Sequence, residues 1–316
     1  MKKVLIARVL PDEVYPALAG LKVVRRDLTT PLDGVEMRAA LREFDGVMCT
    51  LGDQFSADVF TDVPQPRCKI LANFGVGFNH IDVAAAKAAG VTVTNTPGAV
   101  TDATADTAMT LMLMSARRAG EGERLVRSGA WEGWHPTQML GLHLTGKAVG
   151  IAGMGRIGQA IARRCHYGFG MAVHYFGRTP KDLPFDTTFH SDIAQMARNV
   201  DVLVTAVASN AQTRHLINAE ILEAMQPHAR LINIARGDVV DEAALIDALQ
   251  RGVIGGAGLD VYEFEPRVPQ ALRDLDNVVL LPHLGTSTRE VRVDMGLMVV
   301  DNLQAFFRGD PLPNPV

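Results

Sequence analysis

Short runs of β-branched and other apolar residues alternate with longer segments of helical periodicity along the whole chain. This alternation is typical of βα units built around a parallel sheet. The runs that we predict to be strands are 1–6, 69–72, 91–94, 148–151, 171–176, 202–205 and 231–234. The pattern therefore predicts an α/β protein.

Two segments repeat apolar residues at the spacing of one helix face. The first starts near Thr101, and its apolar face consists of Ala105, Ala108, Met109, Met112 and Leu113. The second starts near Ser287, where Ser287 and Glu290 are spaced as a capping box, and its face consists of Val291, Met295, Met298, Val299 and Phe306. The first helix falls between two series of strands, so it is placed to connect two lobes.

The chain has 316 residues, which is enough for about two domains with cores of their own. Turn residues cluster at Thr96-Pro97-Gly98 and from Pro282 to Gly285. These two breaks are compatible with a middle domain that is inserted into an outer, discontinuous one.

Composition narrows the class of protein. The chain has 31 basic and 35 acidic residues, a net charge of -4, and 47% hydrophobic residues. The hydrophobic fraction excludes a disordered chain, and the balanced charge argues against a nucleic-acid or membrane-surface partner. No apolar run reaches the roughly 18 residues of a membrane helix. We therefore expect a folded protein that binds neither nucleic acid nor membrane.

Cysteine and histidine usage predicts a cytoplasmic protein without a bound metal. The three cysteines, Cys49, Cys68 and Cys165, are too few and too scattered for a disulfide framework. The nine histidines form no HExxH, HxH or Cys/His cluster with the spacing of metal ligands. We therefore look for chemistry that depends on an organic cofactor.

A glycine-rich turn follows the predicted strand at 147–152. It reads Gly153-Met154-Gly155-Arg156-Ile157-Gly158 and precedes a helical run at 159–164. In this GxGxxG fingerprint the first glycine permits a tight turn, the second lets a pyrophosphate approach the backbone, and the third allows close helix packing. The N–H groups at the helix start face the phosphates. The alternative is a βα turn that binds nothing, but strand, turn and helix together favour a dinucleotide site.

The end of the next predicted strand indicates which dinucleotide binds. Sites for NAD place an acidic residue there, on the ribose hydroxyls. Here the strand at 171–176 ends in Gly177-Arg178-Thr179, without an acid. Arg178 can form a forked pair with a 2′-phosphate, and Thr179 can add a hydroxyl. We favour NADP(H), with NAD(H) as the alternative if Arg178 is only a solvated charge.

Three later segments place reactive side chains beside strand ends or tight turns, where α/β proteins build active sites. They contain Arg236, the carboxylates Glu263 and Glu265, and His283. Arginine can hold a carboxylate bidentately, and histidine can exchange a proton near neutral pH. A carboxylate bonded to that histidine can fix its tautomer. This set suits reduction of a 2-keto acid, although each residue singly could be a turn cap, a solvated acid or a core histidine.

Ordered motifs over nearly the full length resemble those of the D-isomer-specific 2-hydroxyacid dehydrogenase family, most of all its glyoxylate/hydroxypyruvate reductase branch. The matching stretches are 73–77, 95–98, 104–106, 153–158, 235–237, 240–242, 258–261, 265–266 and 282–283. The resemblance implies two doubly wound parallel-sheet domains, with a Rossmann cofactor domain (99–286) inserted into a flavodoxin-like substrate domain (1–98 and 287–316). It also implies NAD(P)H-dependent reduction of a small 2-keto acid to the (R)-2-hydroxy acid by hydride transfer, in a homodimer.

The resemblance assigns roles to catalytic and cofactor residues. It implies that Arg236 binds the substrate carboxylate and carbonyl, and that His283 is the acid/base. It selects Glu265 over Glu263 as the partner of His283, because the family's glutamate directly precedes proline. Beyond the glycine-rich turn, it implies cofactor contacts for Thr104, Ala235 and Asp260.

The loop at 74–78 is a candidate substrate site. Its two glycines let successive N–H groups point into a shared concavity that can hold a carboxylate. The resemblance implies that Val76 and Gly77 bind the substrate carboxylate there and that Leu51 forms part of an apolar wall. It also implies that Trp134, in an arm with Trp131, either reaches the partner subunit's site or only packs in the dimer.

Two stretches depart from the family's pattern. Asn79-His80 replaces a common Asp-Asn pair, and Ala208-Ser209-Asn210-Ala211 stands where relatives carry a Pro-rich cofactor loop. Glu265 argues against the formate dehydrogenases, which use glutamine as the partner of the histidine. A phosphoglycerate or phenylpyruvate-type dehydrogenase and a non-catalytic NAD(H)-sensing binding protein of the same fold remain alternatives.

Overall fold

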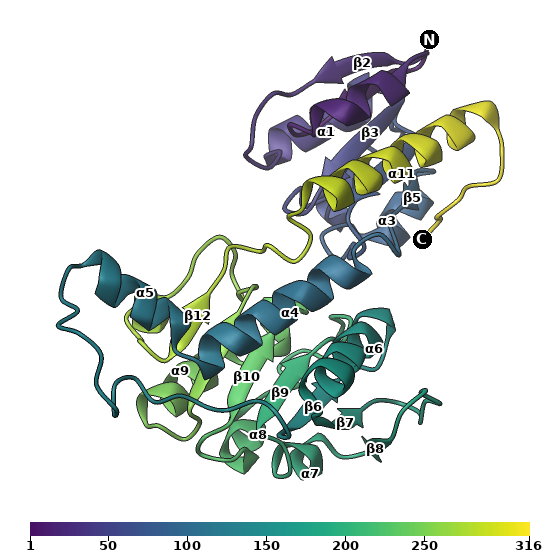
Figure 1. Cartoon of the computed structure of the whole chain (residues 1–316). Helices are drawn as coiled ribbons and strands as arrows, with labels where there is room; N and C mark the ends of the chain where they lie inside the picture. The colour runs from purple at the N-terminus through teal and green to yellow at the C-terminus, as the bar shows by residue number, and fades with distance from the viewer. The chain divides into compact units, whose positions relative to one another are not determined.

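The computed structural model describes all 316 residues, which form two compact units. The first unit combines Met1–Val100 with Thr286–Val316, and the second is Thr101–Gly285. The ends of the chain therefore belong to one unit, and the middle of the chain forms the other (Figure 1).

The first unit is built around a five-stranded parallel sheet in the order β2-β1-β3-β4-β5. Its strands are β1 (Lys3–Ile6), β2 (Lys22–Arg25), β3 (Gly46–Thr50), β4 (Ile70–Phe74) and β5 (Thr92–Thr94). Its helices are η1 (Asp12–Leu18), α1 (Gly34–Glu43), α2 (Ala57–Thr61), α3 (Val83–Ala88) and α11 (Arg289–Arg308). Helix α11, at the far end of the sequence, packs against β4 and η1. This strand order is the flavodoxin-like one.

The second unit has a seven-stranded parallel sheet in the order β12-β11-β10-β9-β6-β7-β8. Its strands are β6 (Ala148–Ala152), β7 (Ala172–Phe176), β8 (Thr187–His190), β9 (Val202–Thr205), β10 (Arg230–Asn233), β11 (Gly256–Leu259) and β12 (Val278–Leu280). Strand order reverses at β6 and β9, which creates the switch point where open α/β sheets bind ligands. The predicted fold class, two doubly wound parallel-sheet domains, is confirmed.

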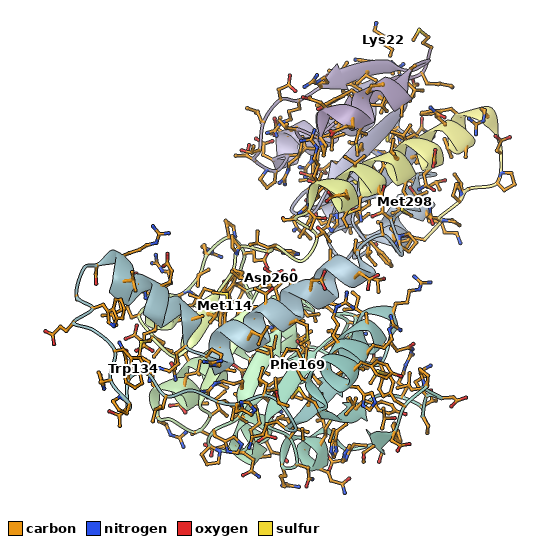
Figure 2. The ribbon with its side chains drawn as sticks, in the orientation of Figure 1. Lys22, Met114, Trp134, Phe169, Asp260 and Met298 are labelled. Carbon is orange, nitrogen blue, oxygen red and sulfur yellow. The ribbon has the colours of Figure 1, made fainter.

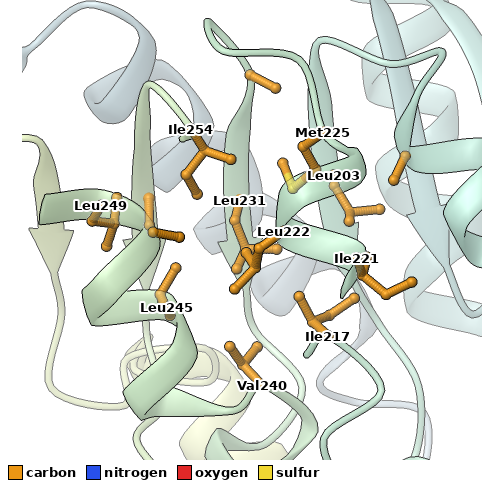
Figure 3. Packing of buried hydrophobic residues seen from close by; sticks show 14 of the residues in the cluster. Leu203, Ile217, Ile221, Leu222, Met225, Leu231, Val240, Leu245, Leu249 and Ile254 are labelled. Carbon is orange, nitrogen blue, oxygen red and sulfur yellow. The ribbon is translucent and has the colours of Figure 1, made fainter. Parts of the chain in front are cut away.

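The helices of the second unit are α4 (Thr101–Ala116), α5 (Ala119–Arg127), α6 (Arg156–Arg163), η2 (Arg164–Gly168), α7 (Ile193–Ala197), α8 (Ala219–Ala224), η3 (Gly237–Val239), α9 (Glu242–Gln250) and α10 (Gln270–Arg273). Helices α4 and α6 pack with one set of apolar residues, and α7, α8 and α9 with another. Figure 3 shows the second set, to which Leu222 of α8, Leu231 of β10 and Leu245 of α9 belong. Burying a leucine side chain contributes roughly 1.5–3 kcal/mol, so these layers hold the sheet that positions the candidate site.

Two details of the predicted helices are wrong. Leu113, predicted on the buried face of α4, is 39% exposed, and the fully buried Leu111 packs toward β11 instead. Helix α11 begins at Arg289 and is capped by Thr288, whose side chain accepts from the N–H of Val291. Ser287 therefore forms no capping box with Glu290, because it lies one residue too early in the chain.

The cysteines lie inside the packed units. Cys49, Cys68 and Cys165 are free thiols, and burial raises the pKa of Cys68 and Cys165 to about 12. Such thiols are unreactive at neutral pH. No group of three His, Cys, Asp or Glu side chains is placed to hold a metal ion, and no helix is long and apolar enough to cross a bilayer.

Candidate active site

The carboxyl ends of the parallel strands in the second unit lie along one sheet edge. The glycine-rich turn follows β6, and the segments that carry Arg236, Glu265 and His283 follow β10, β11 and β12. Because β10, β11 and β12 are neighbours in the sheet, these three side chains converge at the same edge.

His283 and Glu265 form a hydrogen-bonded pair. Nδ1 of His283 lies 2.9 Å from Oε2 of Glu265, and the other carboxylate oxygen accepts the N–H of Tyr262 at 3.0 Å. About three tenths of each side chain is exposed. Since Nδ1 is engaged, Nε2 is the ring nitrogen left to exchange a proton with a ligand.

The charge of Glu265 is set by its partners. Burial alone would raise the pKa of Glu265, but the hydrogen bond and charge of His283, the Tyr262 N–H and the charge of Arg236 hold it below its ordinary value. Glu265 is therefore ionised at neutral pH, as an acceptor for the Nδ1 proton of His283 must be.

Asp260 shapes the turn that carries His283. Its buried carboxylate accepts the N–H of Leu284 at 2.6 Å and of Gly285 at 2.8 Å. Thr104, in the first turn of α4, donates its hydroxyl to the carbonyl of Gly285 at 3.1 Å. Burial raises the pKa of Asp260, and these N–H groups only partly offset that effect. Sequence reasoning predicted cofactor contacts for Asp260 and Thr104 and missed their part in this turn, which joins residues far apart in the chain.

Arg236 carries a buried N–H without a partner. Its Nη1 donates to the carbonyl of Ala235 at 2.7 Å, whereas its Nε is buried and makes no hydrogen bond. Burial lowers the pKa of Arg236, and the charges of Glu265 and Asp238 oppose that shift. An unsatisfied buried donor costs about 1–3 kcal/mol, so an oxyanion that accepts from this guanidinium would be stabilised.

Asn233, the last residue of β10, fixes the turn that carries Arg236. Its Nδ2 donates to the carbonyl of Arg236 at 2.9 Å, and its Oδ1 accepts from the N–H of Ala235 and from Thr205. At Gly237 a Cβ would lie 1.8 Å from the carbonyl carbon of Tyr262. The turn of Arg236 and the loop of Glu265 are thus in direct contact. The sequence signal for Asn233 is an asparagine that ends a buried strand.

The glycine-rich turn has the geometry of a phosphate cradle. Gly153 has φ +103°, and a Cβ at Gly158 would lie 2.0 Å from the carbonyl oxygen of Gly153. By contrast, Gly155 is exposed and has no atom within 4 Å of the Cβ position, so a ligand can approach its backbone. Around it, Met154 is buried, Ile157 is half-buried and Arg156 is exposed. The residues present therefore fit a dinucleotide pyrophosphate at the start of α6.

Arg178 and Thr179 lie just after β7, the strand next to β6, and only Gly177 separates them from its end. Arg178 and Thr179 are both exposed, and Arg178 forms no hydrogen bond or ion pair within the protein. Gly177 stands where an acid would repel a phosphate. The structure leaves both side chains available to a ligand.

The loop at Gly75–Gly77 belongs to the first unit. Asn73 donates to the carbonyls of Gly75 and Gly77 at 3.0 Å, and Asn95 donates to that of Val76 at 2.9 Å. The loop's carbonyls are thus engaged, while the N–H groups of Val76 and Gly77 have no acceptor within the protein. The side chains of Val76 and Leu51 are partly exposed.

The departure at Asn79-His80 supports this loop. Nε2 of the buried His80 lies 3.0 Å from Oδ1 of Asn73. His80 therefore orients the amide that holds two of the loop's carbonyls. Sequence reasoning missed Asn73 and Asn95 as supports, and the signal for Asn73 is again an asparagine near the end of a buried strand.

Trp134 does not join the other candidate residues of its unit. It lies in the irregular arm between α5 and β6, its side chain is 79% exposed, and it is well separated from Asp260 (Figure 2). Trp131 in the same arm is half exposed, and α5 contributes no buried residue. The arm and α5 therefore present apolar surface that the chain itself leaves uncovered.

Comparison with known proteins identifies relatives of the whole chain. Residues 109–285 match the family model described as D-isomer specific 2-hydroxyacid dehydrogenase, NAD binding domain. A glyoxylate reductase of Pyrococcus furiosus is 41% identical over 99% of this chain and 95% of its own. A hydroxyphenylpyruvate reductase of Plectranthus scutellarioides is 44% identical over 79% of each chain.

A solved structure is similar over the full length. The NADPH-dependent glyoxylate/hydroxypyruvate reductase of Sinorhizobium meliloti, in complex with NADP and malonate, superposes with a TM-score of 0.88 and 39% identity. The match covers 100% of this chain and 96% of that one. The fold and the phosphate cradle, seen with these relatives, define a nicotinamide-dependent oxidoreductase. More particularly, the chain belongs to the D-isomer-specific 2-hydroxyacid dehydrogenase family.

Proposed function

We propose that this enzyme reduces glyoxylate to glycolate, and hydroxypyruvate and similar small 2-keto acids to (R)-2-hydroxy acids, and that it prefers NADPH. The observation that carries the catalytic part is the 2.9 Å pair of His283 and Glu265 beside the buried, partly unsatisfied Arg236. The glyoxylate reductases among the relatives support the substrate class.

In this proposal Arg236 binds the carboxylate and carbonyl oxygens of the keto acid. The positive charge of Arg236 stabilises the negative charge that develops on the carbonyl oxygen. Glu265 accepts a hydrogen bond from the Nδ1–H group of His283 and thereby fixes the tautomer of the imidazole. His283 then donates a proton from Nε2 to the carbonyl oxygen. When bound, the nicotinamide supplies the hydride that reduces the carbonyl carbon. In the reverse direction His283 removes the hydroxyl proton.

The second unit would hold the cofactor. The pyrophosphate would bind at residues 153–158, Asp260 would contact the nicotinamide, and Thr104 and Ala235 would contact the cofactor. Arg178 and Thr179 would bind the 2′-phosphate of NADP(H). Support for this preference comes from the unpaired guanidinium of Arg178 and the absence of an acid at Gly177.

The first unit would supply further contacts to the substrate. The free N–H groups of Val76 and Gly77 suit a carboxylate, and Leu51 offers an apolar side chain for the body of the substrate. The exposed Trp134 fits a role in a homodimer, in which it would narrow the partner's pocket or only pack at the interface. A cytoplasmic location also stays a prediction.

An aromatic 2-keto acid is the second candidate substrate, because a hydroxyphenylpyruvate reductase is among the relatives. The proposal is tested by following the loss of NADPH or NADH absorbance with glyoxylate, hydroxypyruvate, pyruvate and phenylpyruvate. We expect the fastest oxidation with NADPH as the cofactor and with glyoxylate or hydroxypyruvate as the substrate. A clear preference for phenylpyruvate would replace the substrate assignment. If cofactor binds and no keto acid is reduced, a sensing protein becomes the better account.

A further inference from the structure

The loop after β11 carries a second histidine–glutamate pair. Glu263 lies two residues before Glu265, but its carboxylate Oε1 is 2.9 Å from Nε2 of His215 and 3.1 Å from Nη2 of Arg214. Only 9% of the Glu263 side chain is exposed. The two glutamates thus bind different histidines, and only the pair of Glu265 belongs to the proposed chemistry.

His215 lies in the segment at 206–217, which follows β9 and contains the stretch that departs from the family's pattern. The segment contacts the glycine-rich turn, because a Cβ at Gly153 would lie 2.7 Å from the backbone of Ala206. It also binds the turn that follows Arg236. The N–H of His215 donates to the carbonyl of Asp238 at 2.7 Å, and Ser209 donates to the Asp238 carboxylate at 2.9 Å.

The backbone of His215 is held in an uncommon conformation. Its φ is +50°, close to the +57° of His283. A left-handed backbone at a residue other than glycine costs of order 1 kcal/mol and persists only where its surroundings impose it. The Asp238 and Glu263 hydrogen bonds are the contacts that impose it here.

Glu263 is connected to Glu265 through a short, constrained loop. The N–H of Tyr262, just before Glu263, donates to Glu265 at 3.0 Å, and the N–H of Glu263 donates to Glu242 at 3.4 Å. Movement of Glu263 would therefore move the Glu265 carboxylate. A displacement near 1 Å at a catalytic group can cost about 100-fold in rate.

We propose that Glu263, held by His215 and Arg214, is a positioning residue that sets the placement of Glu265 against His283. The inference rests on the proposed function of the His283–Glu265 pair. Two other charged groups lie near Glu263 and its partners His215 and Arg214. They are Glu242, which packs against the loop, and Asp241, whose Oδ2 lies 3.9 Å from Nδ1 of His215. Neither of them reaches Glu265 by a hydrogen bond.

The test compares Glu263→Ala, Glu263→Gln and His215→Ala with the control Glu223→Ala, which removes an exposed carboxylate paired with Arg251. We expect Glu263→Ala and His215→Ala to lower kcat about tenfold, with the Kd for NADPH changed less than about twofold. Glu263→Gln should recover most of the loss, because its amide oxygen can still accept from His215. Glu223→Ala should match the wild type.

A second measurement reports on the His283–Glu265 pair and does not require turnover. The ring-proton NMR signal of His283 is followed against pH in the wild type, in Glu265→Gln and in Glu263→Ala. We expect Glu263→Ala to move the titration midpoint in the same direction as Glu265→Gln, by a smaller amount. An unchanged midpoint, or wild-type kcat in Glu263→Ala, would overturn the inference. If the wild type reduces no keto acid, the NMR result still decides the positioning role separately from the proposed function.

Discussion

The backbone N–H of His283 donates to the carbonyl oxygen of Asp260 at 2.9 Å, and the Asp260 carboxylate accepts from the two residues that follow His283. Asp260, the first residue after β11, therefore determines the path of the turn after β12. His283 has φ +57°, and this turn imposes it.

Asp260→Asn tests that relationship. The amide nitrogen would face the N–H of Leu284 or Gly285, leaving one buried donor without an acceptor at a cost of about 1–3 kcal/mol. We expect a lower free energy of unfolding in urea and a kcat reduced at least about tenfold, because the turn places His283. The control is Asp276→Asn, at an exposed aspartate. Unchanged stability and kcat in Asp260→Asn would contradict the role of the turn.

His283→Asn tests the acid/base assignment. The imidazole is proposed to transfer the proton and not to hold the nucleotide, so kcat should fall about 100- to 10,000-fold while the Kd for NADPH changes little. Steady-state kinetics and quenching of protein fluorescence by NADPH measure the two quantities. Activity within a few-fold of the wild type would remove His283 from the mechanism.

Arg178→Ala tests the cofactor preference. Losing a forked guanidinium–phosphate pair should weaken NADPH binding by tenfold or more, and NADH, which lacks the 2′-phosphate, should be affected far less. Arg198→Ala removes an exposed charge of the same sign elsewhere on the unit and serves as the control. Equal losses for NADPH and NADH in Arg178→Ala would refute the phosphate role.

Two glycines of the same turn should respond differently to alanine. At Gly158 the new Cβ would lie 2.0 Å from the carbonyl oxygen of Gly153, so Gly158→Ala should lower the Tm of the free protein. At Gly155 the same position is open, so Gly155→Ala should keep its Tm and lose affinity for NADPH. Thermal unfolding with and without NADPH measures both effects. A stable Gly158→Ala variant would show that the packing is not as tight as described.

Local sequence chemistry predicts much of this molecule. The strands and the glycine-rich turn follow from hydrophobic runs and from residues whose roles are decided within a few positions. The cap of α11 was not determined in this way, because Ser287 and Thr288 carry similar hydroxyls. The backbone N–H of Thr288 donates a hydrogen bond to the carbonyl of Thr286, and this turn makes Thr288 the cap.

Long-range partners are the part that the sequence does not reveal. Glu263 and Glu265 are alike in type and neighbourhood, and only the placement of His215 and His283 by other strands separates them. Asp260 likewise meets Leu284 and Gly285 only because β11 and β12 are adjacent. A family resemblance selected Glu265, but no spacing rule could assign a partner to Glu263.

The most direct test of the proposed function is the configuration of the product. Hydroxypyruvate is reduced with a limiting amount of NADPH, and the glycerate is separated on a chiral column and quantified. The proposal predicts one (R)-glycerate for each NADPH oxidised. (S)-glycerate, or NADPH oxidation without glycerate, would contradict it.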